Sequence, residues 1–384
     1  MEIEKILGKL RNQNKILSQY VFEREEIIET LNLALLSNQH LCIISKPGLA
    51  KSLLGDLKSR FISNSVHAMI FCNSYLKPSE ILGPLSIQEL KAGKQIYMTK
   101  NYAPDAHILT MEEVFKAEKQ LSICLPLLNE RFFMQDGIRV KTPLISALLF
   151  SNEMPSDKEL NAFWNRVMFR FQVDNCGESD NFQKILNGNF QELENHPEFA
   201  QNVVSIDEIK FAQNWIKNKV EISQETGQVI ETIFRICRSE GIECSDRQVR
   251  WTGQIIRVVA ALDNRTKTIP EDAEFLKNVL WNDPGKDKQT VFKIVIENCN
   301  KELVAILKAM DTSTVVIRNW MKSVKEGIAI DHHRIRGELD ECKSDIDKIT
   351  PSAKNQQEYN RAVHTTTLNH RKVSEWMREN KLQN

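Results

Sequence analysis

The segment from Ser45 to Ser52 holds the side chains of this sequence that are best suited to bind phosphate groups. It reads Ser-Lys-Pro-Gly-Leu-Ala-Lys-Ser, and it follows an apolar run, Leu41–Ile44, that predicts a buried strand. The apolar residues after it recur with the spacing of one helix face: Leu53, Leu54, Leu57 and Phe61. A strand, a tight loop and a helix entered through Lys-Ser form the layout of a phosphate-binding loop, because backbone N–H groups and the helix N-terminus offer positive potential.

The last two residues of this loop have distinct predicted roles. Lys51 would reach the β- and γ-phosphates of a nucleotide, and the Ser52 hydroxyl would hold Mg²⁺. The predicted nucleotide-binding residues of the loop are Ser45, Lys46, Pro47, Gly48, Leu49, Ala50, Lys51 and Ser52. The motif is incomplete, because Ser45 and Ala50 stand where it usually has glycine. Taken alone, the loop is explained equally well as an ordinary strand–turn–helix with Lys51 in solvent.

Two acidic residues, Glu112 and Glu113, end another predicted strand, His107–Met111. Phosphate-bound Mg²⁺ needs a carboxylate at a strand end beside the loop, and the attacking water needs a base. Neighbouring residues at a strand tip point in different directions, so one can serve the metal and the other the water. We assign Glu112 to the metal and Glu113 to the water. The alternative is a helix N-terminus, which also favours acidic residues.

Three further polar or charged residues lie near the ends of predicted strands. Asn152 follows a predicted core strand, Leu144–Phe150, where it either forms a turn or orients water near the γ-phosphate. Arg166 and Arg170 belong to a segment that leads into a fifth predicted strand, Phe171–Asp174. From the residue types alone, the catalytic candidates are Glu113 and Asn152, and the two arginines have no role assigned to them at this point.

The order of the remaining patterns predicts an α/β core. Helices over about 1–20 and 27–35 precede the loop, and His67–Cys72 is a further short strand. We expect hairpins around Ala92-Gly93 and Asp136-Gly137, the second because Asp-Gly suits a two-residue type I′ turn.

Beyond about residue 178 the pattern changes to helices with polar connections. Serines at 205, 223 and 245 have the positions of helix caps, and the capping box at Ser245 puts Arg247 in the first turn of its helix. Pro270 begins the last predicted helix of this part. The predicted domains are a nucleotide-binding core at 1–178, an all-α lid at 179–285 and a helical tail at 286–384.

The tail contains a short coiled-coil seam. Its members recur at alternating intervals of four and three residues: Ile335, Leu339, Cys342, Ile346 and Ile349. A helical hairpin, either packed back on the lid or serving as a docking arm, is the simplest arrangement. His332 and His333 suggest a metal, but no third ligand is positioned beside them in the sequence.

Composition narrows the function classes. The 384 residues include 51 Lys plus Arg and 51 Asp plus Glu, so no global charge steers the chain to nucleic acid or a membrane surface. The apolar runs are too short to span a bilayer, and the N-terminus does not read as a signal sequence. Eight scattered cysteines without a CxxC pair favour reduced thiols. We expect a cytoplasmic protein with no nucleic-acid partner and no membrane span.

These motifs follow one another in the order of an AAA+ ATPase, and the chain more closely resembles the MoxR family and its RavA-like branch. The resemblance covers roughly residues 15–285. Its strings are Lys46–Ser52, Gly83–Gln88, Glu112–Glu113, Ser151–Pro155, Arg166–Arg170 and Ser245–Arg247. The Gly-Pro-Leu-Ser-Ile-Gln and Ser-Asn-Glu-Met-Pro strings are the more specific ones.

The resemblance implies a role for each matched residue. Lys51 and Ser52 look like the Walker A residues, Glu112 and Glu113 like Walker B, and Asn152 like sensor 1. Arg166 resembles the arginine finger, with Arg170 as its rival, and Arg247 resembles the sensor 2 residue that contacts nucleotide from the lid. The two expected hairpins look like the helix-2 and pre-sensor insertions of this clade.

The resemblance also implies an architecture and an activity. The family fold is a three-layer α/β core with a five-stranded parallel sheet and an all-α lid, usually assembled as a hexameric ring. Its members use ATP and Mg²⁺, and they are regarded as chaperones or remodellers that often work with a von Willebrand A-domain protein. ATP hydrolysis at the subunit interfaces of a homo-oligomer that remodels a protein is therefore the leading hypothesis.

Two departures support a second hypothesis. Walker B usually has Asp where this chain has Glu112, and the extra methylene displaces the carboxylate in a metal shell that demands near-octahedral geometry. The other departure is in the loop, where Ser45 and Ala50 stand in place of the usual glycines. Separately, the tail shows no β-rich insertion of the kind RavA uses to recruit its partner, so the identity of that partner is not transferred to this chain. A nucleotide-gated scaffold that binds ATP but hydrolyses it weakly is the alternative. A small-molecule kinase is a third, but it gives no reason for a lid arginine or an Asn-ended strand.

Overall fold

The protein is described from a computed structural model, which covers residues 2–117, 120–155, 161–188, 192–328, 330–352 and 355–380. The chain divides into two compact units, Met1–Val291 and Phe292–Asn384, which are described separately. Within the described residues, no helix is both long enough and apolar enough to cross a membrane.

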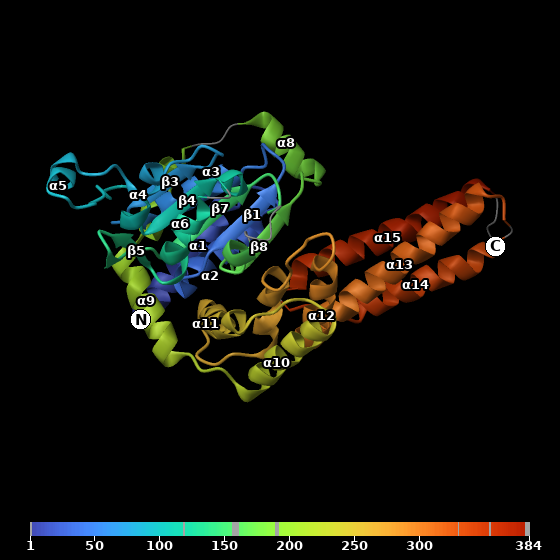
Figure 1. The fold of residues 1–384 in the computed structure, drawn as a ribbon. Coiled ribbons are helices and arrows are strands. Elements are labelled where there is room, and N and C mark those ends of the chain that lie inside the picture. The colour runs from blue at the N-terminus through green and yellow to red at the C-terminus, as the bar shows by residue number, and fades with distance from the viewer. Residues whose placement is uncertain are drawn as a thin grey trace. The chain divides into compact units, whose positions relative to one another are not determined.

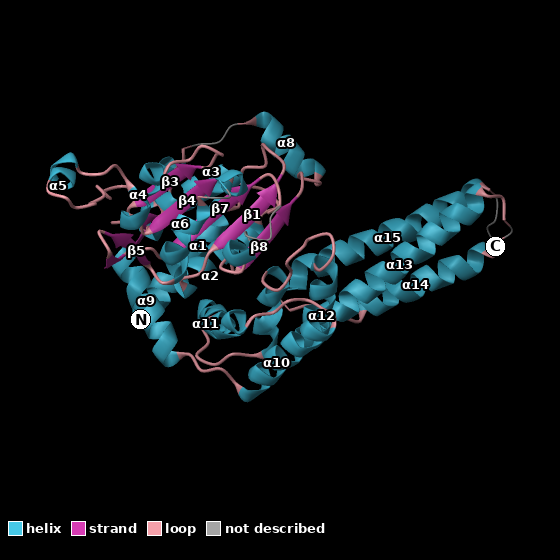
Figure 2. Ribbon diagram, viewed as in Figure 1, coloured by secondary structure: helices cyan, strands magenta, loops and turns pink. Residues whose placement is uncertain are grey.

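A five-stranded parallel sheet forms the centre of the first unit (Figures 1 and 2). In spatial order its strands are β3 (His67–Phe71), β4 (Ile108–Glu112), β7 (Ser146–Ser151), β1 (Leu41–Ser45) and β8 (Phe169–Val173). Leu41 of β1 pairs with Leu148 of β7 on one side and with Phe169 of β8 on the other. Every residue of β1 is buried, as an apolar strand inside a parallel sheet must be. The predicted fold class is confirmed.

The helices that pack around the sheet come largely from the first half of the chain. They are α1 (Glu2–Leu17), α2 (Glu25–Ser37), α3 (Lys51–Arg60), α4 (Pro78–Leu82) and α6 (Leu121–Asn129), with short 3₁₀ helices η1 (Ala103–Asp105) and η2 (Val114–Ala117). Helix α3 packs on β4 and β7, and α2 packs on β1 and β8. The helix that follows the Ser45–Ser52 loop is thus fixed by the strands that lead to the other candidate residues.

One of the two expected hairpins is present as predicted. Strands β5 (Phe132–Gln135) and β6 (Ile138–Lys141) pair antiparallel, and the turn residues Asp136 and Gly137 have φ angles of 49° and 74°. Positive φ at both central residues is the signature of a type I′ turn.

The other expected hairpin is wrong in its local structure. Residues Ile87–Lys91 form a helix, α5, and the two arms of the segment share a single antiparallel bridge between Leu85 and Tyr97. Ser86 caps this helix by accepting a hydrogen bond from the Glu89 amide. A Ser followed three residues later by Glu is a helix-start pattern, and it outweighs the apolar residues that suggested a strand.

The helices after residue 178 complete the first unit. They are α8 (Ser179–Asn187), α9 (Ile206–Lys219), α10 (Gln224–Ser239) and α11 (Asp246–Leu262), with 3₁₀ helices η4 (Leu193–Asn195), η5 (Ala200–Asn202) and η6 (Pro270–Asn278). Ser205, Ser223 and Ser245 cap α9, α10 and α11, as predicted. The helix expected after Pro270 is a 3₁₀ helix instead.

Part of the predicted lid is joined to the core by a short sheet. Strand β9 (Val204–Ser205) pairs with β2 (Ile62–Ser63), and α9 packs on α1 and α2. The segment just before α10 therefore packs as part of the core.

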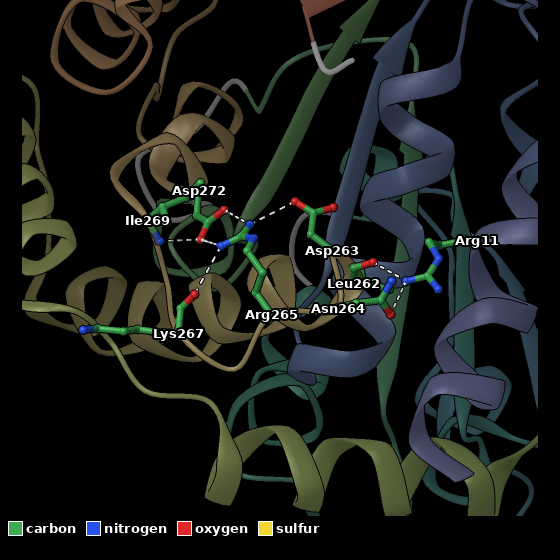
Figure 3. Close-up of polar contacts among 8 residues, drawn as sticks. All are labelled: Arg11, Leu262, Asp263, Asn264, Arg265, Lys267, Ile269 and Asp272. Atoms are coloured by element: carbon green, nitrogen blue, oxygen red, sulfur yellow. Dashed lines mark hydrogen bonds and ion pairs between the residues drawn. The ribbon is translucent and has the colours of Figure 1, made fainter. Parts of the chain in front are cut away.

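Helix α11 is held at its C-terminal end by a residue of α1 (Figure 3). Arg11 donates to the Leu262 carbonyl at 2.5 Å and to the Asn264 side chain at 3.0 Å. A cation at this end also suits the helix dipole. In the following loop, Arg265 pairs with both oxygens of the buried Asp272. These contacts fix the helix that carries Arg247 against the core.

The second unit is a bundle of three helices, not the expected two-helix hairpin. Helices α13 (Lys301–Lys325), α14 (His332–Asp347) and α15 (Gln356–Glu379) pack pairwise on one another, after α12 (Lys288–Cys299) crosses the boundary between the units. Three residues of the predicted seam are buried on α14: Leu339, Cys342 and Ile346. His332 accepts a hydrogen bond from the Trp320 indole, and the described residues contain no cluster of metal-ligating side chains.

A buried lysine on α3 makes the stability of the core depend on pH. Lys58 donates to the Gln13 and Asn32 side-chain oxygens, each at 2.5 Å, so its partners are neutral amides from α1 and α2. Burial lowers the pKa of Lys58 to about 7. Removing an ammonium from water without an opposite charge disfavours the charged form.

We therefore expect the free energy of unfolding to rise between pH 7 and 8.5. In this window the unfolded chain keeps the Lys58 proton while the folded chain releases it, and the gain is at most about 1.4 kcal/mol per pH unit. Chemical denaturation at several pH values measures the slope. Lys58→Met should lose this component, whereas Lys5→Met on the exposed surface of α1 should keep it. Equal slopes in both variants would contradict the assignment.

Candidate nucleotide-binding site

Lys51 lies where three segments of the core meet. Its ammonium donates to the Ser45 carbonyl at 2.9 Å, to the Ser151 carbonyl at 2.9 Å and to Asn152 Oδ1 at 2.7 Å. Ser45 ends β1 and Ser151 ends the neighbouring strand β7. Lys51 therefore spans the carboxyl ends of two adjacent parallel strands, which is where ligands bind in open α/β sheets.

The loop before Lys51 has a backbone that favours glycine. Gly48 has a φ angle of 82°, and Ala50, directly before α3, has a φ angle of 59°. Left-handed conformations cost an L-residue free energy that glycine avoids. Position 50 is one of the two where the sequence departs from the usual motif, so the loop keeps the backbone shape that the missing glycine would adopt.

We expect Ala50→Gly to stabilise the protein by about 1 kcal/mol, since it removes the left-handed strain at this position. The gain is measured by chemical denaturation without nucleotide. Ala92→Gly is the matched control, because Ala92 has a φ angle of −85°. No gain at position 50, or an equal gain at position 92, would contradict the expectation.

The two acidic residues at the end of β4 point in different directions. Glu112 is the last residue of the strand, and Glu113 turns the chain away with a φ angle of 53°. Glu113 Oε1 accepts a hydrogen bond from Asn152 Nδ2, and Glu113 Oε2 lies 3.4 Å from the Lys116 ammonium. Glu113 thus faces Asn152 and Lys51, as its assignment to the reacting water requires.

The Asn152 amide joins a cation to an anion. Its oxygen accepts from Lys51 and its NH₂ group donates to Glu113, so both ends of the amide have charged partners. Burial lowers the pKa of Lys51, while Glu113 and Glu112 act in the opposite direction. Asn152, Lys51 and Glu113 therefore form one hydrogen-bonded group at the sheet edge.

The residues around Glu112 fit a magnesium ion. Its Oε1 is buried without a hydrogen-bond partner among the described residues, and its charge acts on Lys51. The Ser52 side chain is exposed in the first turn of α3. Mg²⁺ bound to a nucleotide takes one or two protein oxygens and completes its octahedron with phosphates and water. A carboxylate oxygen without a partner and a serine hydroxyl match this donor set.

Arg166 and Arg247 lie within electrostatic reach of each other. Burial lowers the pKa of Arg166, and the charge of Arg247 lowers it further. With its amide oriented to accept, the Asn129 oxygen receives hydrogen bonds from Arg166 Nε at 2.5 Å and from a terminal nitrogen at 3.2 Å. Arg247 is exposed on α11, above the Trp251 ring at 5.6 Å. The lid and the segment before β8 thus bring two guanidinium groups together.

Arg170, the predicted rival of Arg166, is enclosed within the protein in this structure. Its side chain is buried, stacks on the Trp164 ring at 4.5 Å and donates to the carbonyls of Trp164, Val167 and Trp281. It also donates to Asn282 Oδ1 at 2.9 Å. A guanidinium enclosed in this way cannot reach into a neighbouring subunit.

Comparison with known proteins agrees with this geometry. Residues 8–214 match the model of the "MoxR domain in the MoxR-vWA-beta-propeller ternary systems", and residues 225–295 match an AAA lid domain. The first match covers more than half of the chain. The chain belongs to the MoxR family. The MoxR match runs to residue 214, whereas the sequence predicts the lid from residue 179.

Two relatives are uncharacterized proteins of Methanocaldococcus jannaschii. MJ0812 is 33% identical over 75% of this MoxR chain and 76% of its own length, and MJ0079 is 30% identical over 90% and 86%. A solved structure from Cytophaga hutchinsonii, described as an ATPase candidate, superposes with a TM-score of 0.58. It is 18% identical and covers 78% of this chain and 96% of its own, so it supports the fold alone.

The sequence alone did not indicate several residues that contact the candidate site residues. Asn129 and Lys116 contact Arg166 and Glu113, and Trp281 with Asn282 encloses Arg170. None of them lies in a motif. Asn129, Trp281 and Asn282 meet their partners because distant segments pack together, whereas Lys116 lies three positions from Glu113 in the chain. The Asn-Asp-Pro turn after Trp281 marks the end of an element, but nothing in it indicates an arginine partner.

We expect Arg170→Ala to lower the free energy of unfolding by about 2–4 kcal/mol. The substitution leaves buried carbonyls without donors and opens a cavity against Trp164. Arg250→Ala, at an exposed position on α11, is the matched control and should cost less than about 0.5 kcal/mol. Calorimetry without nucleotide measures both. An unchanged stability of Arg170→Ala would contradict this structural role.

Proposed function

We propose that this MoxR-family protein is an ATPase that remodels a protein partner. The observation that carries the proposal is the single amide of Asn152 held between Lys51 and Glu113. Hydrolysis of a nucleoside triphosphate requires a lysine that binds the phosphates, an amide that orients the water and a carboxylate base. Here they meet at the carboxyl end of a parallel sheet.

Binding of ATP would rest on the loop Ser45–Ser52. Lys51 would exchange its carbonyl partners for the β- and γ-phosphates, and the backbone N–H groups around Gly48 would cradle them. Ser52 and Glu112 would hold Mg²⁺, which neutralises phosphate charge when it is bound. The Glu112 oxygen that lacks a hydrogen-bond partner among the described residues supports this assignment.

Glu113 would polarise the attacking water, and Asn152 would orient it. In the structure Asn152 donates to Glu113 Oε1 and accepts from Lys51, which limits the rotation of the Asn152 and Glu113 side chains. A base held in this way accepts the water proton as the new P–O bond forms. Arg247, from the lid, would contact the phosphates, because it lies within electrostatic reach of Arg166.

Glu113→Gln tests the base directly. The amide can keep the hydrogen bond to Asn152 but accepts no proton, so we expect ATP binding to persist while turnover falls about 10²–10⁴-fold. Phosphate release and equilibrium binding of a fluorescent ATP analogue measure the two effects. Glu153→Gln removes the same charge from an exposed neighbour of Asn152 and should leave both unchanged. Normal turnover by Glu113→Gln would end the assignment.

We also propose that the active form is a ring, usually hexameric in this family, with Arg166 acting on the neighbouring subunit. An arginine supplied in trans contributes about 10³–10⁵ in rate to related reactions. Arg166 is half-buried and the like charge of Arg247 acts on it, so a phosphate anion that reached both guanidinium groups would offset their mutual repulsion.

Mixing two inactive variants tests the trans contact. Arg166→Ala has an intact base, and Glu113→Gln has an intact finger, so random co-assembly should restore about a quarter of the wild-type turnover. Phosphate release after co-refolding, with subunit exchange checked by tagged chains, is the measurement. Undiminished activity of Arg166→Ala alone, or no recovery in the mixture, would contradict the proposal.

The partner proposed is a protein with a von Willebrand A domain. The matched family model is described from ternary systems that pair MoxR with such a domain and a β-propeller, which supports this choice. Exposed apolar side chains on the α5 segment and on the β5–β6 hairpin supply a surface for a protein substrate: Leu85, Ile87, Leu90, Met98, Met134 and Ile138. We also propose that the protein belongs to the RavA-like branch of the family and that it lies in the cytoplasm.

A second candidate is a nucleotide-gated scaffold with weak hydrolysis. Glu112 in place of Asp favours it, because the longer side chain alters the distance between the strand end and a metal. Steady-state phosphate release by the assembled protein separates the two. A rate no higher than that of Glu113→Gln, with ATP still bound, would favour the scaffold.

A further inference from the structure

The end of helix α6 holds the Arg166 side chain. Arg166 follows the short helix α7 (Asn161–Trp164), and its backbone amide donates to the Phe163 carbonyl at 2.9 Å. Its guanidinium donates to the side-chain oxygen of Asn129, the last residue of α6, through Nε at 2.5 Å and through a terminal nitrogen at 3.2 Å. The donors of a guanidinium are fixed in one plane, so two hydrogen bonds to one oxygen set both the direction and the rotation of that plane.

The residue that supplies this oxygen is itself held in place. Arg131 lies two positions after Asn129 and donates to the Leu128 carbonyl in the last turn of α6. Its other terminal nitrogen donates to the Asn38 carbonyl at 2.6 Å, directly after α2, and to the Ile145 carbonyl at 3.2 Å, directly before β7. The end of α6 is therefore tied to two elements of the core, and Asn129 presents its oxygen from a fixed position.

The acceptor on Asn129 is a neutral amide, which orients the guanidinium without neutralising its charge. Burial and the like charge of Arg247 lower the pKa of Arg166, and the charge of the exposed Glu130 acts in the opposite direction. A carboxylate in place of the amide would hold the arginine by an ion pair, which a phosphate would have to replace. The amide thus fixes the geometry of Arg166 and leaves its positive charge available to an anion.

We propose that Asn129 is a positioning residue, which orients Arg166 of its own subunit toward the nucleotide site of the neighbouring subunit. This role rests on the proposed function, in which Arg166 acts in trans. Asn129 acts through Arg166 and needs no contact with the nucleotide or the reacting water. Without the amide oxygen, the long arginine side chain would sample more rotamers, and a smaller fraction of them would direct the guanidinium at a phosphate.

The contact itself can be measured without nucleotide. In full-length protein that is isotope-labelled at arginine Nε, NMR follows the exchange of the Arg166 Nε–H with solvent, and the signal is assigned by its loss in Arg166→Ala. We expect Asn129→Ala to speed this exchange about ten-fold, because the Nε–H loses its acceptor. Asn129→Asp keeps an acceptor oxygen and should leave the exchange slow. Asn218→Ala removes an amide from the exposed surface of α9 and is the matched control. Unchanged exchange in Asn129→Ala would overturn the proposal.

Turnover tests the role in trans. We expect Asn129→Ala to lower kcat about ten-fold and to leave the KM for ATP nearly unchanged, because the arginine acts in the transition state. Glu113→Gln subunits lack the base but have an intact Asn129 and Arg166. Replacing half of the Asn129→Ala protein with them should therefore raise turnover at constant total protein. With random co-assembly, we expect a rise from about a tenth to about a quarter of the wild-type value.

Asn152→Ala is the matched control for the mixture, because Asn152 lies beside the base of its own subunit. Its mixture with Glu113→Gln should show no such rise. A fall in the turnover of Asn129→Ala upon mixing, or a turnover of Asn129→Ala equal to or above that of the wild type, would overturn the positioning role and leave the trans action of Arg166 intact. Full turnover by Arg166→Ala alone would instead reject the proposed finger, and the role of Asn129 with it, even where the exchange experiment confirms the contact.

Discussion

The amide of Asn152 is the contact on which the arrangement of the site depends. It holds the Lys51 ammonium through its oxygen and the Glu113 carboxylate through its nitrogen, so it satisfies two opposite charges in one place. This is possible because β7 lies between β1 and β4 in the sheet. Strand order places the loop, the amide and the carboxylate at one edge, and the polar contacts then restrict their side chains.

Three buried or half-buried cations of this protein are held in different ways. Lys51 has carboxylates nearby that oppose the effect of burial on its pKa, whereas Lys58 has only amide oxygens and its pKa falls to about 7. Arg170 is enclosed by carbonyls and an indole ring, and its pKa falls to about 9. Only the first of these environments leaves a cation whose present partners a phosphate can replace.

Contacts at two places set the position of helix α11. Arg11 holds the C-terminal end of α11, and Arg170 holds the segment after η6, so α11 is fixed at a place where Arg247 acts on Arg166. The first turn of α11 thus carries a candidate phosphate contact at a position that two distant arginines stabilise.

The sequence by itself determined the elements whose signals are local. Lys51, Ser52 and the Asp136-Gly137 turn were predicted from neighbouring residues, because caps, turns and apolar periodicity act over a few positions. The tertiary structure decided what long-range packing controls. It enclosed Arg170 with residues more than a hundred positions away and made a three-helix bundle of the tail. Burial depends on all the segments that surround a side chain, and no short stretch of sequence contains them.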